Sequence, residues 1–258
     1  MKLLLKSAVI FGMTLPSVAL AQETRPELWS GLQRGMTVEE AAVAVLKIDG
    51  VKSAKIKTNK KTGMKSVDIS HKGRGGDFGG FPGFVELNFD QGGLKSVSIN
   101  YAPYQGHCLS AAGPIYGRLA SLLPQKYTEV SRSRDLDDSY IAQARALRAR
   151  EYLTVISGDK RATDSVNLVN PTIVFNNEQN AVILKANVVA KNYSLSGRDG
   201  EPSLLDNYQN MDFTRCKADY GIVSYPHVQY MIMQDYLNDL ENTRDANADE
   251  DRADAQKL

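Results

Sequence analysis

The chain has 258 residues, of which 42% are hydrophobic and 24% are charged, as in an ordinary globular protein. This composition excludes a wholly disordered chain, a collagen-like repeat and a disulfide-dense miniprotein. Lys and Arg number 31 against 30 for Asp and Glu, so the net charge of +1 gives no global signature of a nucleic-acid-binding protein. We therefore expect no nucleic acid among the partners and look for charged partners only in local clusters.

Residues 1–21 have the pattern of a secretory signal peptide. Two lysines flank its leucine-rich start, an apolar run follows, and Ala19 and Ala21 form a small-residue cleavage site. The apolar run is too short to cross about 30 Å of hydrocarbon, and no later run reaches the roughly 18 residues of a membrane span. We therefore expect cleavage between Ala21 and Gln22, a mature protein in the periplasm, and no transmembrane segment in it.

The only two cysteines, Cys108 and Cys216, remain after this cleavage. In an oxidising compartment an even pair predicts a disulfide bond. The three histidines, His71, His107 and His227, are isolated from one another and the chain has no C-x-x-C motif. We therefore expect no metal site and no cofactor.

The first half, residues 22–104, contains a clear helix start. Thr37 is a predicted N-cap and Glu40 closes a capping box, and apolar residues follow at helical spacing, which predicts a helix over 38–46. Four segments with alternating apolar residues come next and predict an antiparallel meander. These segments are centred on residues 54–56, 67–69, 85–89 and 97–101. The helix is expected to pack on one face of this sheet, leaving the other face to solvent or to a partner.

The second half, residues 105–240, restarts with a predicted helix over 109–123 and a second one over 138–151. Strands are predicted at residues 152–157, 172–175, 181–190 and 211–220. The polar turn between the second and third of these strands predicts a hairpin. This half therefore repeats the helix-then-meander architecture, and the fold class expected is α+β with two such modules in tandem.

The end of the chain is less regular. From Pro226 the apolar spacing favours a helix to residue 240, although Tyr230 and Ile232 also suit the end of a strand. Residues 241–258 contain six acids, three bases and almost no large apolar residue, which predicts a disordered acidic tail.

The segment from Trp29 to Tyr101 resembles the superfamily of the SmpA/OmlA outer-membrane assembly lipoproteins and the β-lactamase inhibitory protein. The resemblance is carried by Gly35-Met36-Thr37 with Glu39 and Glu40, by the helix to Leu46, and by the hairpin Phe89-Asp90-x-x-Gly93-Leu94-x-x-Val97. It implies a small module with a helix on an antiparallel sheet, sometimes in tandem, that binds proteins in the cell envelope. Lipidated members carry a cysteine directly after the signal peptide, where this chain has Gln22.

A basic run in the first half is the strongest local charge anomaly. Residues 47–74 contain nine basic and two acidic residues. One predicted hairpin carries four of these bases, Lys55, Lys57, Lys60 and Lys61. One interpretation is a contact with anionic lipid or glycan. The other is a solvated sheet edge, where lysines discourage aggregation.

A glycine-rich stretch at residues 73–83 superficially suggests a phosphate-binding loop. Such a loop leads into a helix, but the residues that follow here alternate as a strand, so we predict a long mobile hairpin connection. Phe78 and Phe81, if exposed on it, are candidate partner contacts.

No hydrolase motif of the G-x-S-x-G, H-E-x-x-H or S-x-x-K type is present. The acids Asp135, Asp137 and Asp138 precede a predicted helix, where acidic residues favour helix formation. We therefore assign no catalytic residue and expect a non-catalytic, protein-binding module of the bacterial envelope. The alternatives are a soluble binder of anionic lipid or glycan and a hydrolase whose triad forms only in space.

Overall fold

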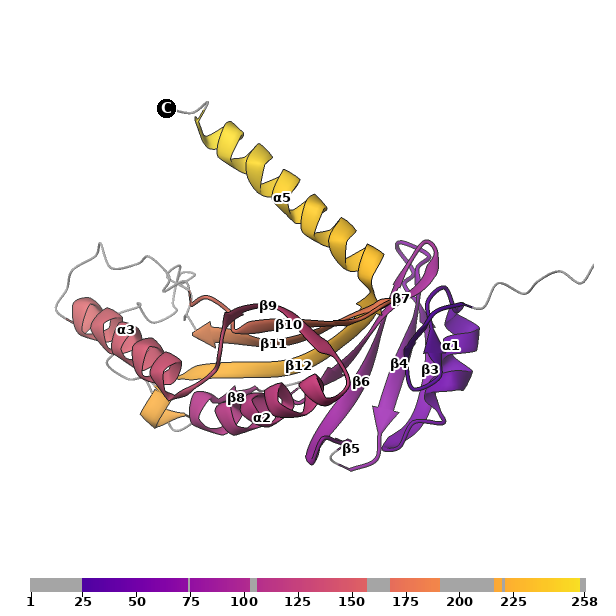
Figure 1. Ribbon diagram of the computed structural model, residues 1–258, viewed down its shortest axis with the longest axis horizontal. Helices are drawn as coiled ribbons and strands as arrows, with labels where there is room; N and C mark the ends of the chain where they lie inside the picture. Colours follow the sequence, from indigo (N-terminus) through magenta and orange to yellow (C-terminus); the bar gives the residue numbers. More distant parts are fainter. Residues whose placement is uncertain are drawn as a thin grey trace, which may run out of the picture.

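The computed structural model describes residues 25–73, 75–102, 106–156, 168–190, 216–219 and 221–255. The predicted signal peptide and its cleavage site between Ala21 and Gln22 lie outside these residues. The described part combines helices with antiparallel strands, which confirms the α+β fold class. Figure 1 shows the strands of both halves running through the middle of the molecule, with helices at its two ends.

The predicted first helix is present as α1 (Val38–Val45), and it begins with the predicted capping box. The Thr37 hydroxyl accepts a hydrogen bond from the Glu40 amide at 3.1 Å, and the Glu40 carboxylate accepts one from the Thr37 amide at 2.8 Å. Both bonds satisfy amides that have no partner within the helix. The buried face of α1 carries Ala41, Ala42 and Val45, and this face covers the sheet of the first half.

The four strands predicted for the first half are also present and antiparallel. They are β3 (Val51–Thr58), β4 (Lys65–His71), β6 (Phe81–Asp90) and β7 (Gly93–Asn100). The hairpin of β3 and β4 forms a separate two-stranded sheet. Its link to β6 includes a side chain, because Nε2 of His71 accepts a hydrogen bond from the Val85 amide at 2.9 Å.

The glycine-rich stretch is an ordered hairpin, which corrects the prediction of a long mobile connection. Its first strand, β5 (Gly76–Phe78), pairs with the start of β6 so that Phe78 lies opposite Phe81. The Asp77 carboxylate accepts a hydrogen bond from the Gly80 amide at 2.8 Å and closes the turn. Both phenylalanines are half-buried and pack against the larger hydrophobic core, so neither forms an exposed tip. The glycines here allow a tight turn and leave the aromatic rings free to fold inward.

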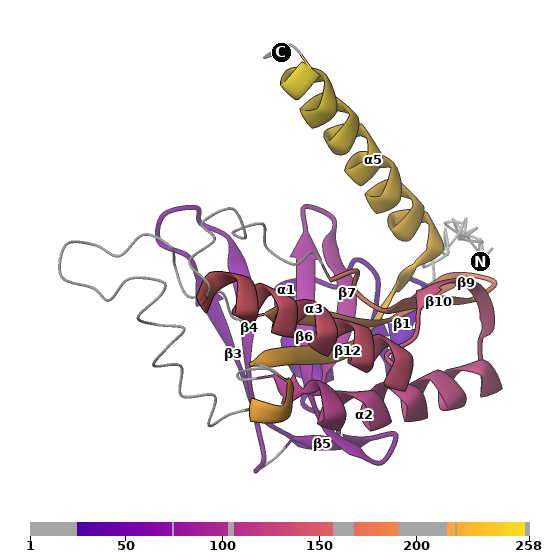
Figure 2. The ribbon, with the colours of Figure 1, turned by 90° about the vertical axis from the view of Figure 1, so that its left-hand side faces the viewer.

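The second half begins with two helices and with two strands, β8 and β9, that the sequence did not indicate. The elements are β8 (His107–Cys108), α2 (Leu109–Leu122), the 3-10 helix η1 (Leu123–Gln125), β9 (Thr128–Arg134) and α3 (Asp138–Ile156). Both predicted helices are confirmed, and α2 continues without a break through Pro114. The two helices pack against each other at the end of the molecule that Figure 2 brings to the front.

The remaining strands complete a second antiparallel meander. They are β10 (Thr172–Asn177), β11 (Asn180–Ala190) and β12 (Ile222–Ile232), and the predicted hairpin of β10 and β11 is confirmed. A short 3-10 helix, η2 (Lys217–Asp219), precedes β12.

Three predictions for this half were wrong. Residues 152–156 continue α3 instead of forming a strand, because a helix already under way can accommodate a short run of β-branched and aromatic residues. In the described part of the predicted strand 211–220, residues 217–219 form η2. The helix favoured from Pro226 is strand β12 as far as Ile232, the alternative that the sequence left open. Pairing with β11 along its whole length outweighs the helical spacing of its apolar residues.

The two meanders join into one sheet. The strand order is β5-β6-β7-β12-β11-β10-β9, and β8 also pairs with β12, which makes eight strands in all. The junction is the antiparallel pair of β7 and β12, where Val228 lies opposite Ile99 and Tyr230 opposite Val97. The tandem units therefore share a continuous sheet, and the last strand of one unit lies beside the last strand of the other.

Helix α5 (Met233–Ala255) follows β12 and stands away from the body in both views (Figures 1 and 2). Its first turns are tied to the first half by two ion pairs of 2.6 Å, from Arg34 Nε to Asp235 and from Lys95 to Asp239. The backbone of the predicted tail is thus helical as far as Ala255, while residues 241–246 are all exposed, as their polar composition leads one to expect.

Candidate binding cleft

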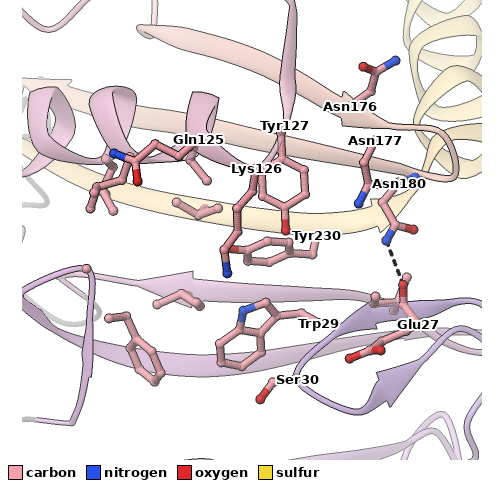
Figure 3. A pocket seen from close by; sticks show the side chains of 18 of the residues that line it. Glu27, Trp29, Ser30, Gln125, Lys126, Tyr127, Asn176, Asn177, Asn180 and Tyr230 are labelled. Atoms are coloured by element: carbon pink, nitrogen blue, oxygen red, sulfur yellow. Dashed lines mark hydrogen bonds between the residues drawn. The ribbon is translucent and has the colours of Figure 1, made fainter.

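A cleft of about 1350 Å³ opens on the helix-covered side of the sheet, where the two halves meet. Its floor is the junction of the two halves, with Ile99 beside β12 residues Val228 and Tyr230. Figure 3 shows that one wall comes from the end of α2 and the segment that leads into β9, and that the opposite wall comes from the N-terminal strands and the β5 hairpin. The cleft therefore exists only in the assembled sheet.

Four aromatic rings form a connected cluster in this cleft. Trp29 stacks on Tyr230 with ring centroids 5.8 Å apart, and its edge meets Phe78 at 5.6 Å. Tyr127 adds a tilted contact with Tyr230 at 6.5 Å. Aromatic pairs at these separations add to the stability that burial alone supplies. The rings come from three strands and the segment that leads into β9, so their geometry is held by the fold as a whole.

Trp29 reaches the cleft because the N-terminal segment folds into a small hairpin of β1 (Glu27–Trp29) and β2 (Leu32–Gln33). The turn between these strands has positive φ angles at Ser30 and Gly31. The Glu27 carboxylate accepts a hydrogen bond from the Gly31 amide at 2.7 Å and closes this turn. Leu28 is buried in the core, so its neighbour Trp29 is placed over the sheet.

The phenol groups of the cleft are neutral at ordinary pH. Burial raises the pKa of Tyr230 and Tyr101 well above the usual value of about 10, and burial raises that of Tyr127 in the same direction. A neutral phenol both donates and accepts a hydrogen bond. The aromatic cluster thus offers polar groups as well as apolar surface.

The rim of the cleft is rich in amide side chains. These are Gln125, Asn176, Asn177, Gln179 and Asn180. The Asn180 side-chain amide donates to the Glu27 carbonyl at 2.8 Å, a bond that ties the second half to the first across the rim (Figure 3). The side-chain oxygen of Asn180 is a buried acceptor beside the cleft lining, without a hydrogen-bond partner in the described residues.

The charge of the cleft is mixed. The ionisable groups that line it besides the phenols are the carboxylates of Glu27, Asp77 and Glu178 and the ammonium group of Lys126. Charges of both signs beside amides and aromatic rings suit a ligand with its own donors, acceptors and apolar groups. They do not single out a polyanion.

Histidines take no part in the cleft lining, and each is engaged with the backbone elsewhere. His71 accepts from the Val85 amide, His107 Nε2 lies 2.9 Å from the Tyr101 carbonyl, and His227 Nδ1 lies 3.3 Å from the Tyr225 carbonyl. Burial lowers the pKa of His227. Within the residues that the structure describes, no group of three or more His, Cys, Asp or Glu side chains is arranged to hold a metal ion.

The predicted disulfide between Cys108 and Cys216 is confirmed, with Cα atoms 5.2 Å apart. It joins the residue before α2 to the turn that precedes β12. Next to it, the buried carboxylate of Asp219 accepts from the Ser110 amide at 3.3 Å and from the Arg145 guanidinium at 2.5 Å. Asp219 thus supplies the cap for α2 that Cys108, as its N-cap residue, does not provide.

None of the four predicted lysines lines the cleft. Lys55 and Lys57 are on β3 and Lys60 and Lys61 are in the turn that follows, and all four are exposed. Of the two predicted phenylalanines, Phe78 lines the cleft and Phe81 packs against the core beside it.

Sequence reasoning missed Trp29, Tyr127 and Tyr230 as site residues. At Tyr230 the spacing favours a helix over the strand end that it also allows, and the segments around Trp29 and Tyr127 give no periodic signal. An available clue was that the single tryptophan of the chain stands just before the recognisable helix start, in a segment with no assigned core role.

No helix within the described residues is both long and apolar enough to cross a membrane. Comparison of the chain with protein-family models, with curated proteins and with solved structures gives no match.

Proposed function

We propose that this protein is an exported, non-catalytic protein-binding module that holds an extended segment of a protein partner in its aromatic cleft. The observation that carries the proposal is the cluster of Trp29, Phe78, Tyr127 and Tyr230 at the junction of the two halves, bordered by amide side chains.

The size and chemistry of the cleft favour a polypeptide over a small molecule. Its volume of about 1350 Å³ exceeds the roughly 300–1,000 Å³ of typical small-ligand pockets. Tyrosine and tryptophan are enriched at the energetic centres of protein interfaces. Asparagine and glutamine side chains match the donors and acceptors of a peptide backbone, and five of them line this cleft.

Three features of the chain support an envelope location. The signal-peptide pattern ending at Ala21 predicts export. The bond between Cys108 and Cys216 is of the kind that persists in an oxidising compartment such as the periplasm. The resemblance of residues 29–101 to envelope modules that bind proteins points the same way.

The hydrolase alternative receives less support. A triad needs a histidine within hydrogen-bond reach of both a nucleophile and a carboxylate. In the described residues the ring nitrogens of His71, His107 and His227 contact backbone groups. The cleft offers aromatic and amide groups in place of this arrangement.

The proposal is tested by site-specific photo-cross-linking in the native envelope. A photoreactive amino acid replaces Gln125 or Asn177, which are exposed on the rim, and in a control it replaces Glu86, which is exposed on the other face of the sheet. We expect a discrete polypeptide adduct from both rim positions and none from the control. Equal adducts from all three positions, or none from the rim, would contradict the proposal.

The cross-linked segment, identified by mass spectrometry and synthesised as a peptide, is then titrated against the purified protein. Trp29 is the only tryptophan and lies in the cleft, so its fluorescence reports binding directly. Tyr127→Ala should weaken binding by about tenfold or more, as expected for an interface tyrosine. Tyr236→Ala, which removes an equally half-buried tyrosine from α5, is the matched control and should leave the affinity unchanged.

A further inference from the structure

One face of the hairpin of β3 and β4 packs against the rest of the protein, and the other face is exposed. Ala54, Val67 and Ile69 pack against the core of the first half under α1. On the opposite face Lys55 lies across from Asp68 and Lys57 across from Ser66, and these four residues are exposed. The hairpin is thus anchored by its inner face and presents lysines on its outer one.

The tip of this hairpin is ordered by its own hydrogen bonds. The Asn59 side-chain oxygen accepts from the amides of Lys61 at 2.9 Å and Thr62 at 3.3 Å, and the Gly63 amide donates to the Asn59 carbonyl at 2.8 Å. This turn holds Lys60 and Lys61 at the end of the hairpin, together with Met64. The Met64 side chain is 65% exposed, although it is a large apolar group.

The lysines of the hairpin greatly outnumber its acids. Residues 51–71 contain six lysines and a single aspartate. Two of the six form surface ion pairs, Lys57 with Asp68 at 2.8 Å and Lys65 with Glu39 at 2.7 Å. No carboxylate among the described residues lies within 4.0 Å of the other four, which are Lys52, Lys55, Lys60 and Lys61. Exposed ion pairs of this kind are weak, so the positive charge of the hairpin is largely uncompensated.

We propose that the tip of this hairpin docks on the surface of a lipid bilayer rich in anionic phospholipids, with Met64 entering the headgroup region. Lysines attract an anionic surface, and an apolar side chain between them gains from leaving water at the boundary of the acyl chains. A soluble anionic glycan satisfies the lysines but offers no apolar layer for Met64. The exposed methionine is therefore the feature that distinguishes a bilayer from other polyanions.

The hairpin and the cleft are separate surfaces. The hairpin belongs to a separate two-stranded sheet, and none of its residues lines the cleft. A protein partner held beside Trp29 and a membrane surface held at Lys60 can be bound at the same time or separately. Tyr127→Ala should leave vesicle binding unchanged, so that failure of one proposal is distinguishable from failure of the other.

The test is co-sedimentation of the full mature protein with vesicles of phosphatidylcholine containing phosphatidylglycerol, compared with vesicles of phosphatidylcholine alone. We expect binding to the anionic vesicles only, and a steep loss with added salt. The variant K60E/K61E should lower the partition coefficient by at least about 25-fold, since each lysine near an anionic surface contributes about fivefold. R118E/R244E changes exposed arginines on α2 and α5 with the same change in net charge, and it should bind like the unmodified protein.

A second pair of variants tests the role of the bilayer itself. Met64→Gln should weaken vesicle binding several-fold, while Val43→Gln, which alters a 64% exposed valine on α1, should not. The same two variants should bind heparin, a soluble polyanion, equally well. The proposal is overturned if the protein binds neutral vesicles equally, if K60E/K61E binds like R118E/R244E, or if Met64→Gln leaves vesicle binding intact. Circular dichroism of each variant establishes that the fold is retained.

Discussion

The disulfide should stabilise the whole sheet, and the effect can be sized from the structure. The bond between Cys108 and Cys216 spans 108 residues. In the chain-entropy model a loop of this length raises the free energy of unfolding by about 4.8 kcal/mol, and measured losses of native disulfides are typically 2–5 kcal/mol. We therefore expect the variant C108S/C216S to lose about 2–4 kcal/mol. For a chain of this size that loss lowers the melting temperature by roughly 4–16 °C.

The strand order determines which strands are destabilised when the disulfide is removed. A separate second module would be destabilised alone, but β12 begins just after Cys216 and pairs with β7 of the first half. Weakening the anchor of β12 should therefore increase hydrogen exchange in β7 as well as in β11. The ion pair of buried Asp219 with partly exposed Arg145 lies beside the bond and should be loosened with it.

The assay is equilibrium unfolding in urea, followed by Trp29 fluorescence and by far-ultraviolet circular dichroism. Both probes should shift to a lower midpoint in C108S/C216S, and a reducing agent should shift the unmodified protein to the same midpoint without affecting the variant. An unchanged midpoint would refute the estimate. Loss of protection in β11 with none in β7 would refute the coupling of the two halves.

Two further predictions concern the first half. His71 Nε2 accepts from the Val85 amide, and burial lowers the pKa of this histidine, so the folded state resists its protonation. The free energy of unfolding should therefore fall as the pH drops below about 6.5, the pKa of histidine in an unfolded chain. His71→Gln should flatten this pH dependence, measured as urea midpoints from pH 5 to 8. An unaltered slope in the variant would contradict the role given to His71. Gly50 has a φ of +78°, and a Cβ atom there would lie 2.2 Å from the Gly76 amide nitrogen. Gly50→Ala should cost more than about 4 kcal/mol or prevent folding, whereas Gly63→Ala, also at positive φ but in open space, should cost about 1–2 kcal/mol in the same assay.

Sequence alone determined the features that depend on neighbouring residues. The capping box of Thr37 and Glu40 starts α1 because both partners lie within one turn. The strands of the first half and the hairpin of β10 and β11 follow from alternation of apolar residues with polar turns between them. Cys108 and Cys216 were paired by number and compartment, since no other pairing exists within the chain.

Tertiary structure decided the features that depend on distant partners. The segment from Pro226 to Ile232 has apolar spacing that fits a helix, yet it is a strand because β11 and β7 offer it hydrogen bonds on both sides. Phe78 turns inward because Trp29, some fifty residues earlier in the chain, gives it an aromatic neighbour. Local backbone preferences are weak, within about 1 kcal/mol per residue, and long-range pairing and burial outweigh them. The cleft could not be predicted from the sequence, because its lining comes from segments that only the joined sheet brings together.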